Sequence, residues 1–198
     1  QAEAALLLFL SGVINPLGGV PGAMISGPNG AGKTAAARRL AGLIDPLAAQ
    51  TVGAPSDPAG FFIVARSRLV TVVDNVSSIP GPISDLACSL ATGGGLAVRT
   101  LYTTGEVSNL IAKRPLIWTS IVEPIKRADL LDRTANITLA PLTARRTDAE
   151  LDADWSRDHP AILALLLDVA AKALASVNAV RQTIAAADLP RMADAAVF

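Results

Sequence analysis

The sequence contains only one cysteine, Cys88, and only one histidine, His159. A single cysteine excludes an internal disulfide framework and a CxxC metal site, which fits the reducing environment of the cytoplasm. We interpret Cys88 as a small core residue. Because the histidine has no second histidine or cysteine cluster to join, we expect no zinc site and interpret His159 as a solvated or capping residue.

The sequence also lacks a net charge, since 17 lysines and arginines balance 17 aspartates and glutamates. This balance argues against a broad basic face for nucleic acids. Any contact with DNA therefore has to come from a few local charges, or from the assembly of several copies into a ring.

Charged residues are absent between Glu3 and Lys33, a span long enough for a transmembrane helix. Asn15, Pro16 and the glycines and prolines that follow them would break such a helix and leave backbone groups unsatisfied in lipid. We therefore expect residues 5–14 to form a short buried helix, and we expect the protein to make no membrane contact. No basic region precedes this apolar stretch, so a signal peptide is not expected either.

Strand and helix patterns alternate along the first 145 residues. Residues 22–26 and the apolar run that ends at Asp74 (RLVTVVDN) are typical of buried strands, whereas residues 33–44 and 83–92 are typical of helices. Residues 47–60, rich in proline and glycine, predict a long connection. The turn TGEVS predicts a hairpin that runs into a further strand, RPLIWTS. This alternation indicates an α/β fold with a parallel sheet flanked by helices.

The pattern changes after a boundary that we place between residues 145 and 146. Beyond it we expect a helix over AELDADWSRD, a second helix that begins at Pro160, and a last piece around LPRMAD. Residues 1–145 are thus predicted to form the α/β core with its N-terminal helix, and residues 146–198 a small helical lid. Because the chain begins at Gln1 without a methionine, we expect a piece truncated at both ends from a longer protein.

The segment GPNGAGKT, from Gly27 to Thr34, matches the P-loop pattern GxxxxGK[ST] and lies between a predicted strand and a predicted helix. In that position, backbone N–H groups and the positive end of the helix converge on one place for phosphate oxygens. Lys33 would reach the β and γ phosphates of a nucleotide, and the Thr34 hydroxyl would bind magnesium. The other members of the predicted nucleotide-binding loop are Gly27, Pro28, Asn29, Gly30, Ala31 and Gly32.

A P-loop also needs a second magnesium partner, commonly an acid at the end of a neighbouring buried strand. Asp74 has this position, although a solitary aspartate at a strand end can also be a turn former. The next residue is Asn75, where many ATPases of this kind carry a glutamate that orients the attacking water. An asparagine can hydrogen-bond this water but cannot take its proton, so we expect hydrolysis to be slow.

Together, GPNGAGKT, the block from Asp74 to Gly95, and the segments RPLIWTSI, RADLLDR and LPRMAD resemble the AAA+ ATPase domain of phage- and prophage-type primase-helicase proteins of actinobacterial mobile elements. The order of these segments is similar to that in superfamily 3 helicases. The resemblance covers the chain from Gly22 to Asp194. It implies a P-loop NTPase fold with a C-terminal lid, and ATP and Mg²⁺ as ligands.

The resemblance also implies roles for three further residues. Thr119 falls at the sensor-1 position, where the family often has asparagine, and would contact the γ phosphate or the water. Arg133 falls at the arginine-finger position, from which a guanidinium would stabilise the phosphoryl group in the neighbouring subunit; a surface ion pair with Asp129 or Asp132 is the alternative. Arg191 falls at the sensor-2 position and would either touch the nucleotide or pack within the lid.

The predicted hairpin, which precedes the Thr119 strand, is where related helicases carry a loop that grips DNA. Arg99, Lys113 and Arg114 are the available cations, and their repetition around a ring would build a channel for phosphates. The alternative is an ordinary solvated face, and Glu106 at the tip of the turn disfavours DNA binding.

We therefore expect an AAA+ module that binds and hydrolyses ATP, assembles into a hexameric ring, and drives unwinding or translocation of single-stranded or forked DNA during phage or mobile-element replication. Two alternatives stay open: a nucleotide-dependent assembly or loader switch, and a structural domain that binds ATP without hydrolysing it. A small-molecule kinase is disfavoured, because no residues for a phosphate-acceptor pocket are recognisable.

Overall fold

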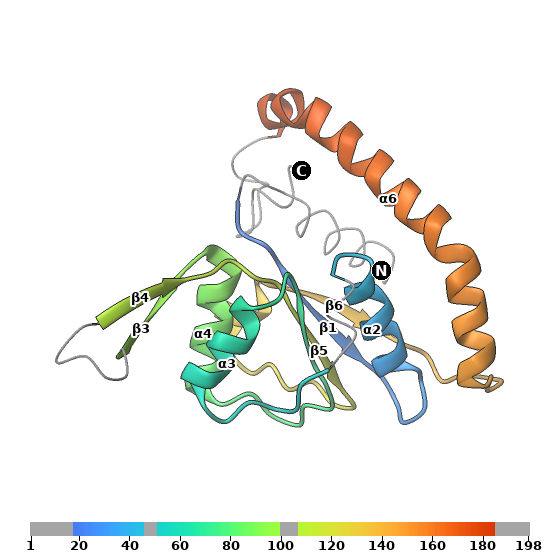
Figure 1. Cartoon of the computed structure of the whole chain (residues 1–198), viewed down its shortest axis with the longest axis horizontal. Helices are drawn as coiled ribbons and strands as arrows, with labels where there is room; N and C mark the ends of the chain where they lie inside the picture. Colours follow the sequence, from blue (N-terminus) through green and yellow to red (C-terminus); the bar gives the residue numbers. More distant parts are fainter. Residues whose placement is uncertain (1–17, 46–50, 100–106, 185–198) are drawn as a thin grey trace.

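A parallel sheet forms the centre of the chain, whose computed structural model describes residues 18–45, 51–99 and 107–184. The sheet has four strands in the order β2-β5-β1-β6 (Figure 1). Neighbouring strands all run in the same direction. The strands are β1 (Gly22–Ser26), β2 (Thr71–Val73), β5 (Leu116–Ser120) and β6 (Thr134–Thr138). The predicted α/β fold with a parallel sheet flanked by helices is therefore confirmed.

Helices cover both faces of this sheet, as parallel strands require. On one face, α2 (Lys33–Gly42) packs on a cluster that includes Ile25 and Ile117. On the other face, α3 (Pro58–Arg66) and α4 (Gly81–Thr92) pack on Met24 and Trp118, which is only 1% exposed. Alternate residues of the same strands thus feed two separate apolar layers, and this packing holds the strand ends in fixed positions.

Helix α3 lies partly in the stretch, residues 47–60, that the sequence predicted to be a connection. The predicted connection agrees with residues 51–57 but was wrong for residues 58–60, because it counted Pro58 and Gly60 only as turn residues. The Asp57 side chain accepts hydrogen bonds from the N–H groups of Ala59 and Gly60, and Pro58 follows it directly. An aspartate N-cap before a proline is a standard way to begin a helix.

An antiparallel hairpin, β3 (Gly95–Arg99) and β4 (Val107–Ile111), projects from the body of the molecule (Figure 1). Gly93, with φ 86°, ends α4 just before it, at the end of the helix predicted over residues 83–92. The hairpin leads into β5, so the predicted hairpin followed by a strand is confirmed. A short helix, α5 (Ala128–Leu131), then precedes β6, an edge strand that the sequence reading did not identify.

One long helix, α6 (Asp148–Thr183), follows the sheet where the sequence predicted two helices. Thr147 and Glu150 form a complete capping box at its start. Pro160 lies inside the helix rather than at the first position of a new one, so this prediction was wrong. The alanines and leucines around it are strong helix formers, and they offset the backbone hydrogen bond that proline removes.

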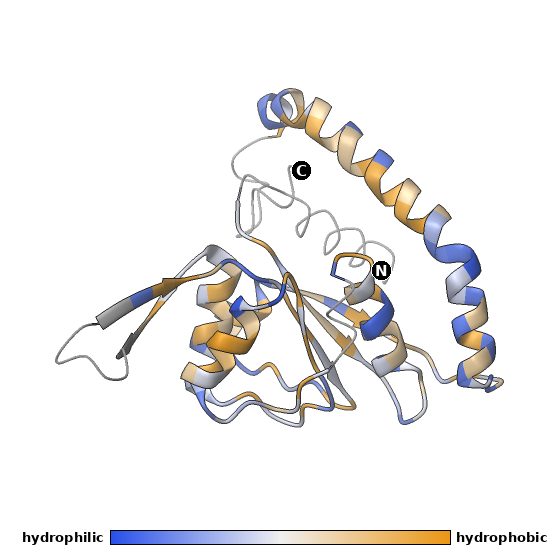
Figure 2. Cartoon of the chain, in the orientation of Figure 1, coloured by the Kyte–Doolittle hydropathy of each residue, from blue (hydrophilic) through white to orange (hydrophobic). Residues whose placement is uncertain are grey.

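The first part of α6 is hydrophilic and its middle part is largely hydrophobic (Figure 2). Among helices of the described residues, α6 alone is long and apolar enough to cross a membrane by length and composition, a test that helices of soluble proteins also meet. The predicted boundary between residues 145 and 146 falls just before this helix. The predicted helix over residues 5–14 and the LPRMAD segment lie outside the described residues.

Candidate functional site

The predicted nucleotide-binding loop connects β1 to α2 at the carboxyl edge of the sheet. Gly27 has φ 150° and Gly32 has φ 79°, conformations that residues with side chains rarely adopt. A Cβ atom at Gly27 would lie only 2.7 Å from the carbonyl oxygen of Leu139, so the chain after β6 also presses against the loop. Backbone geometry therefore requires glycine at both positions.

Lys33 begins α2 and folds back over this loop. Its Nζ donates to the carbonyl oxygens of Gly27 and Pro28, at 2.9 and 2.8 Å. Because the N-cap residue is Gly32, no N-cap side chain accepts a hydrogen bond from the N–H groups of the first turn. The first turn of α2 thus presents backbone N–H groups beside an ammonium group, an arrangement that suits a bound anion. The remaining loop residues, Asn29, Gly30 and Ala31, lie between Pro28 and Gly32.

Two hydroxyl side chains, one from the first turn of α2 and one from the end of β5, meet at Asp74, which follows β2. The hydroxyl of Thr34 donates to Asp74 Oδ1 at 2.8 Å, and the hydroxyl of Thr119, at the end of β5, donates to the same oxygen at 2.5 Å. Because β5 lies between β1 and β2 in the sheet, Thr119 bridges the loop strand and the aspartate strand. Thr119 is only 1% exposed, so this contact is shielded from solvent.

Asn75 follows Asp74 in an unusual conformation. Its φ is 56°, the left-handed region, which asparagine tolerates better than most residues. Its backbone N–H donates to the Thr119 hydroxyl oxygen at 2.9 Å, and its side chain is exposed at the edge of the site. The left-handed backbone conformation and this hydrogen bond therefore fix the position from which the exposed Asn75 side chain extends.

The residues at this site fit magnesium better than a transition metal. Thr34 supplies a hydroxyl and Asp74 a carboxylate, and hard divalent cations prefer such oxygen ligands. Magnesium usually retains several waters and needs few protein ligands. No group of three or more histidine, cysteine, aspartate or glutamate residues with metal-site spacing occurs in the part of the chain that the structure describes.

A cleft of about 370 Å³ begins at Ala31 and Gly32 and runs between α2 and α6. Its walls are mainly apolar and include Leu142, Leu151 and Ile162. An apolar cleft that opens directly onto the glycine loop can hold the flat, weakly polar part of a ligand whose charged part lies on the loop.

Arg133 lies at the end of the sheet opposite the glycine loop, directly before β6. Its carbonyl oxygen accepts from the N–H of Gly22, the first residue of β1. Its Nη1 donates to the carbonyl oxygen of Asp129 at 2.5 Å and contacts Cys88 Sγ at 3.8 Å. The Arg133 guanidinium is thus bound by Asp129 and Cys88 of the same chain, and it lies at the opposite end of the sheet from the glycine loop of that chain.

Cys88 is half-buried between α4 and α5 rather than fully inside the core. Burial raises the pKa of the Cys88 thiol, and the carboxylate of Asp129 raises this pKa further. The thiol is therefore poorly ionised at neutral pH, which agrees with a packing role.

The cations predicted to contact DNA lie at the hairpin or its base. Lys113 donates from Nζ to the carbonyl oxygen of Gly18 at 2.5 Å, and Arg114 donates to the carbonyl oxygen of Lys113 at 2.8 Å. Arg99 is the last residue of β3. The Lys113 side chain therefore fastens the base of the hairpin to Gly18, and the backbone N–H of Arg114 fastens it to the carbonyl oxygen of Leu90 in α4. Arg191, the predicted sensor-2 residue, lies outside the described residues.

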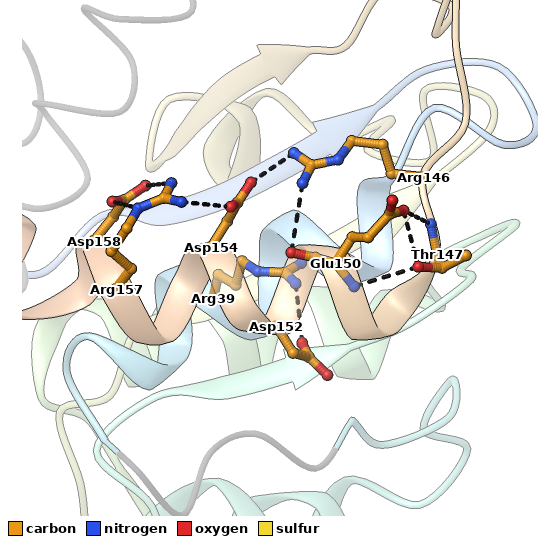
Figure 3. Close-up of polar contacts among 8 residues, drawn as sticks. All are labelled: Arg39, Arg146, Thr147, Glu150, Asp152, Asp154, Arg157 and Asp158. Atoms are coloured by element: carbon orange, nitrogen blue, oxygen red, sulfur yellow. Dashed lines mark hydrogen bonds and ion pairs between the residues drawn. The ribbon is translucent and has the colours of Figure 1, made fainter.

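The start of α6 is tied to α2 and to its own approach segment by charged groups that the sequence reading did not single out (Figure 3). Arg39 of α2 pairs with Asp152 at 3.1 Å, and Arg146 pairs with Asp154 at 2.6 Å. The hydrogen bond from Arg146 lowers the pKa of the Asp154 carboxyl. No sequence signal marks Asp152 or Asp154, because the acids of the first turn, which the helix dipole favours, are Asp148 and Glu150.

Many solved structures are similar to the chain in fold, and two of them show the coverage and identity of such matches. The active helicase SCCmec type IV Cch has a TM-score of 0.54 and 17% identity, with 91% of this chain and 36% of its own chain covered. The apo A form of the NrS-1 C-terminal region has a TM-score of 0.50 and 11% identity, with 77% and 37% covered. The chain thus spans little more than a third of either structure, and at these identities the likeness concerns the fold.

No curated protein matches the chain. A family model does match it, over residues 1–198, and the family is described as the actinomycete integrative conjugative element replication protein. This agrees with the expected likeness to replication proteins of actinobacterial mobile elements. Since the match covers the whole chain, the chain belongs to the family of actinomycete integrative conjugative element replication proteins.

Proposed function

We propose that the chain is a P-loop ATPase module, of AAA+ type, that serves replication of its mobile element. The observation that carries this proposal is the meeting of Thr34 and Thr119 on Asp74 Oδ1, beside the glycine loop. A structural domain needs no such convergence of two hydroxyls on one carboxylate at the mouth of an anion-binding loop. A magnesium-nucleotide site needs these groups in this place.

Each residue of the site has a role in this proposal. The loop from Gly27 to Gly32 wraps the phosphates with its backbone N–H groups, and Lys33 exchanges its two carbonyl partners for phosphate oxygens. Thr34 and Asp74 hold the magnesium ion, which neutralises charge on the phosphates. Thr119 keeps Asp74 in position. The cleft between α2 and α6 takes the adenosine part of the nucleotide.

Asn75 positions the attacking water in this mechanism. Its exposed amide can accept or donate a hydrogen bond but cannot take up a proton. Phosphoryl transfer depends mainly on positioning and on charge stabilisation, so an asparagine still allows turnover, at a reduced rate.

The module acts as a DNA motor when copies assemble into a hexameric ring in the cytoplasm, without membrane contact. Arg133 faces away from its own glycine loop, so it can complete only the site of a neighbouring copy. Release of its contact with the Asp129 carbonyl would free the guanidinium for this role. The family's replication function and the likeness in fold to an active helicase support unwinding or translocation of single-stranded or forked DNA. Arg99, Lys113 and Arg114 are the cations at the hairpin that would contact the strand, and Lys113 and Arg114 would have to exchange their carbonyl partners for phosphates.

A nucleotide-dependent switch is the second candidate, and Asn75 is the observation that favours it. An ATPase without an acid at this position can bind ATP tightly and turn it over too slowly to drive a motor. Such a protein would assemble or load a partner rather than unwind DNA.

ATP turnover by the purified chain separates these two functions. The assay covers a wide range of protein concentrations, with and without single-stranded DNA. For the motor, we expect the rate per chain to rise steeply with concentration, to increase with DNA, and to fall to background in Lys33→Ala. Tight binding with no turnover under any condition would support the switch.

An arginine supplied by a neighbour has its own signature in this assay. Arg133→Ala should bind ATP normally but hydrolyse it poorly, and mixing it with Lys33→Ala should restore part of the activity. Unchanged turnover in Arg133→Ala would remove Arg133 from the mechanism.

A further inference from the structure

The segment that connects β6 to α6 runs alongside the glycine loop. The N–H of Leu139 donates to the carbonyl oxygen of Ser26 at 2.9 Å, immediately before the loop begins. Further along the same segment, Arg145 lies against Gly30 at the tip of the loop. A Cβ atom at Gly30 would lie 3.1 Å from Arg145 Nη2 and 3.7 Å from Cζ. The guanidinium therefore rests directly on the backbone of the glycine loop.

Arg145 differs from the arginines around it, which pair with carboxylates. Arg39 pairs with Asp152, Arg146 with Asp154, and Arg157 with Asp154 and Asp158 (Figure 3). Arg145, in contrast, makes no hydrogen bond or ion pair with any residue that the structure describes. Its guanidinium is exposed and is placed by contact with Gly30 rather than by a carboxylate.

The position suits a phosphate ligand for two reasons. Gly30 lies between the two ends of a loop whose backbone N–H groups and Lys33 already favour an anion. A guanidinium offers several N–H donors in a planar fork that matches phosphate oxygens and stays charged at any physiological pH. No nearby carboxylate has to be displaced before Arg145 can bind such an anion.

We propose that Arg145 binds the nucleotide directly, by donating from its guanidinium to a β- or γ-phosphate oxygen. This inference rests on the proposed nucleotide site and adds to it a ligand from the same chain, distinct from Lys33 and from the predicted Arg133. Because Arg145 lies two residues before the N-cap of α6, Thr147, the contact also links the phosphates to the start of that helix.

Gly30 is a glycine for two reasons under this proposal. Its φ of 76° disfavours any side chain, and a Cβ atom would push the guanidinium away from the loop.

The test measures the affinity of the purified chain for the fluorescent probe N-methylanthraniloyl-ATP with Mg²⁺, by fluorescence anisotropy. We expect Arg145→Ala to weaken the affinity about tenfold or more, the range for charge-assisted hydrogen bonds, and Arg145→Lys to weaken it less. The melting temperature without nucleotide should stay at the wild-type value, since Arg145 loses no hydrogen bond or ion pair with the described residues. The stabilisation of the fold by Mg-ATP should shrink in Arg145→Ala.

Two matched variants separate a direct contact from indirect effects. Arg38→Ala removes the same charge from an exposed position on α2, and Arg146→Ala loosens the approach to α6 without removing Arg145. Both should keep the affinity close to the wild-type value. Equal losses in Arg145→Ala and either control, or wild-type affinity in Arg145→Ala, would overturn the inference.

Failure of the nucleotide site itself would look different. If the wild-type chain does not bind the probe, or if Lys33→Ala binds it equally well, the proposed function fails. If the wild type binds, Lys33→Ala does not, and Arg145→Ala matches the wild type, the role of Arg145 alone is refuted.

Discussion

Thr119→Val is the substitution that examines the centre of the site most closely, because valine has nearly the shape of threonine but no hydroxyl. In the wild type, Thr119 Oγ1 donates to Asp74 Oδ1 at 2.5 Å and accepts from the Asn75 N–H at 2.9 Å. Valine removes both bonds at a side chain that is 1% exposed. The Asn75 N–H then has no partner there, and Asp74 retains only the donor from Thr34.

The loss can be estimated from these two bonds. A hydrogen bond to a charged group contributes about 1.5–3 kcal/mol, and a buried donor without a partner costs about 1–3 kcal/mol. Since valine regains part of this through its added methyl group, we expect the free energy of unfolding to fall by about 2–4 kcal/mol. Thr119→Ser keeps the hydroxyl and should lose only about 1 kcal/mol, for one buried methyl group.

Urea denaturation without nucleotide, followed by circular dichroism, measures both variants independently of any ATP chemistry. A loss below about 1 kcal/mol in Thr119→Val would refute the bridging role of the hydroxyl. A loss in Thr119→Ser as large as that in Thr119→Val would show that shape, rather than hydrogen bonding, decides the stability of this position.

Three further predictions concern the scaffold. Phe62→Ala, at a side chain with no exposure, should lower the free energy of unfolding by about 3–5 kcal/mol in the same urea experiment, whereas wild-type stability would contradict the packing of α3. The thiol of Cys88 should react with a disulfide reagent at pH 8 more slowly than free cysteine, because burial and then Asp129 raise its pKa; equal rates before and after unfolding would contradict this. The backbone N–H and then the hydroxyl of Thr147 lower the pKa of Glu150, so its stabilisation is present above the ordinary pKa of 4.5 and is lost as the pH falls through the lowered value. Glu150→Gln should accordingly melt earlier than wild type at pH 7 and no earlier in strong acid, and a difference that persists in acid would refute the capping role.

Thr119 was assigned by the family resemblance alone, without a predicted contact to Asp74. The sequence itself predicted the parallel sheet and a shared site for Thr34 and Asp74, because Thr34 opens a helix and Asp74 follows a buried strand. The carboxyl ends of parallel strands share one edge, so residues at these ends have to lie close together. Local pattern and one topological rule were sufficient for this part of the site.

Other features depend on the path of the chain in space. Helix α3 had a local signal in Asp57 followed by Pro58, but the prolines and glycines of this stretch were interpreted as a connection. The continuity of α6 through Pro160 depends on the helix formers on both sides. The contact of Arg145 with Gly30 joins residues 115 positions apart and has no local pattern at all. Likewise, no sequence rule shows that the Lys113 ammonium is bound to a backbone carbonyl.

Calorimetric titration of Mg-ATP into the wild-type chain and into Lys33→Ala and Asp74→Asn measures the central claim most directly. We predict saturable binding to the wild type that weakens when magnesium is chelated, no measurable binding to Lys33→Ala, and loss of the magnesium dependence in Asp74→Asn. Absence of binding to the wild type, or equal binding by all three proteins, would contradict a nucleotide site built from the Gly27–Thr34 loop and Asp74.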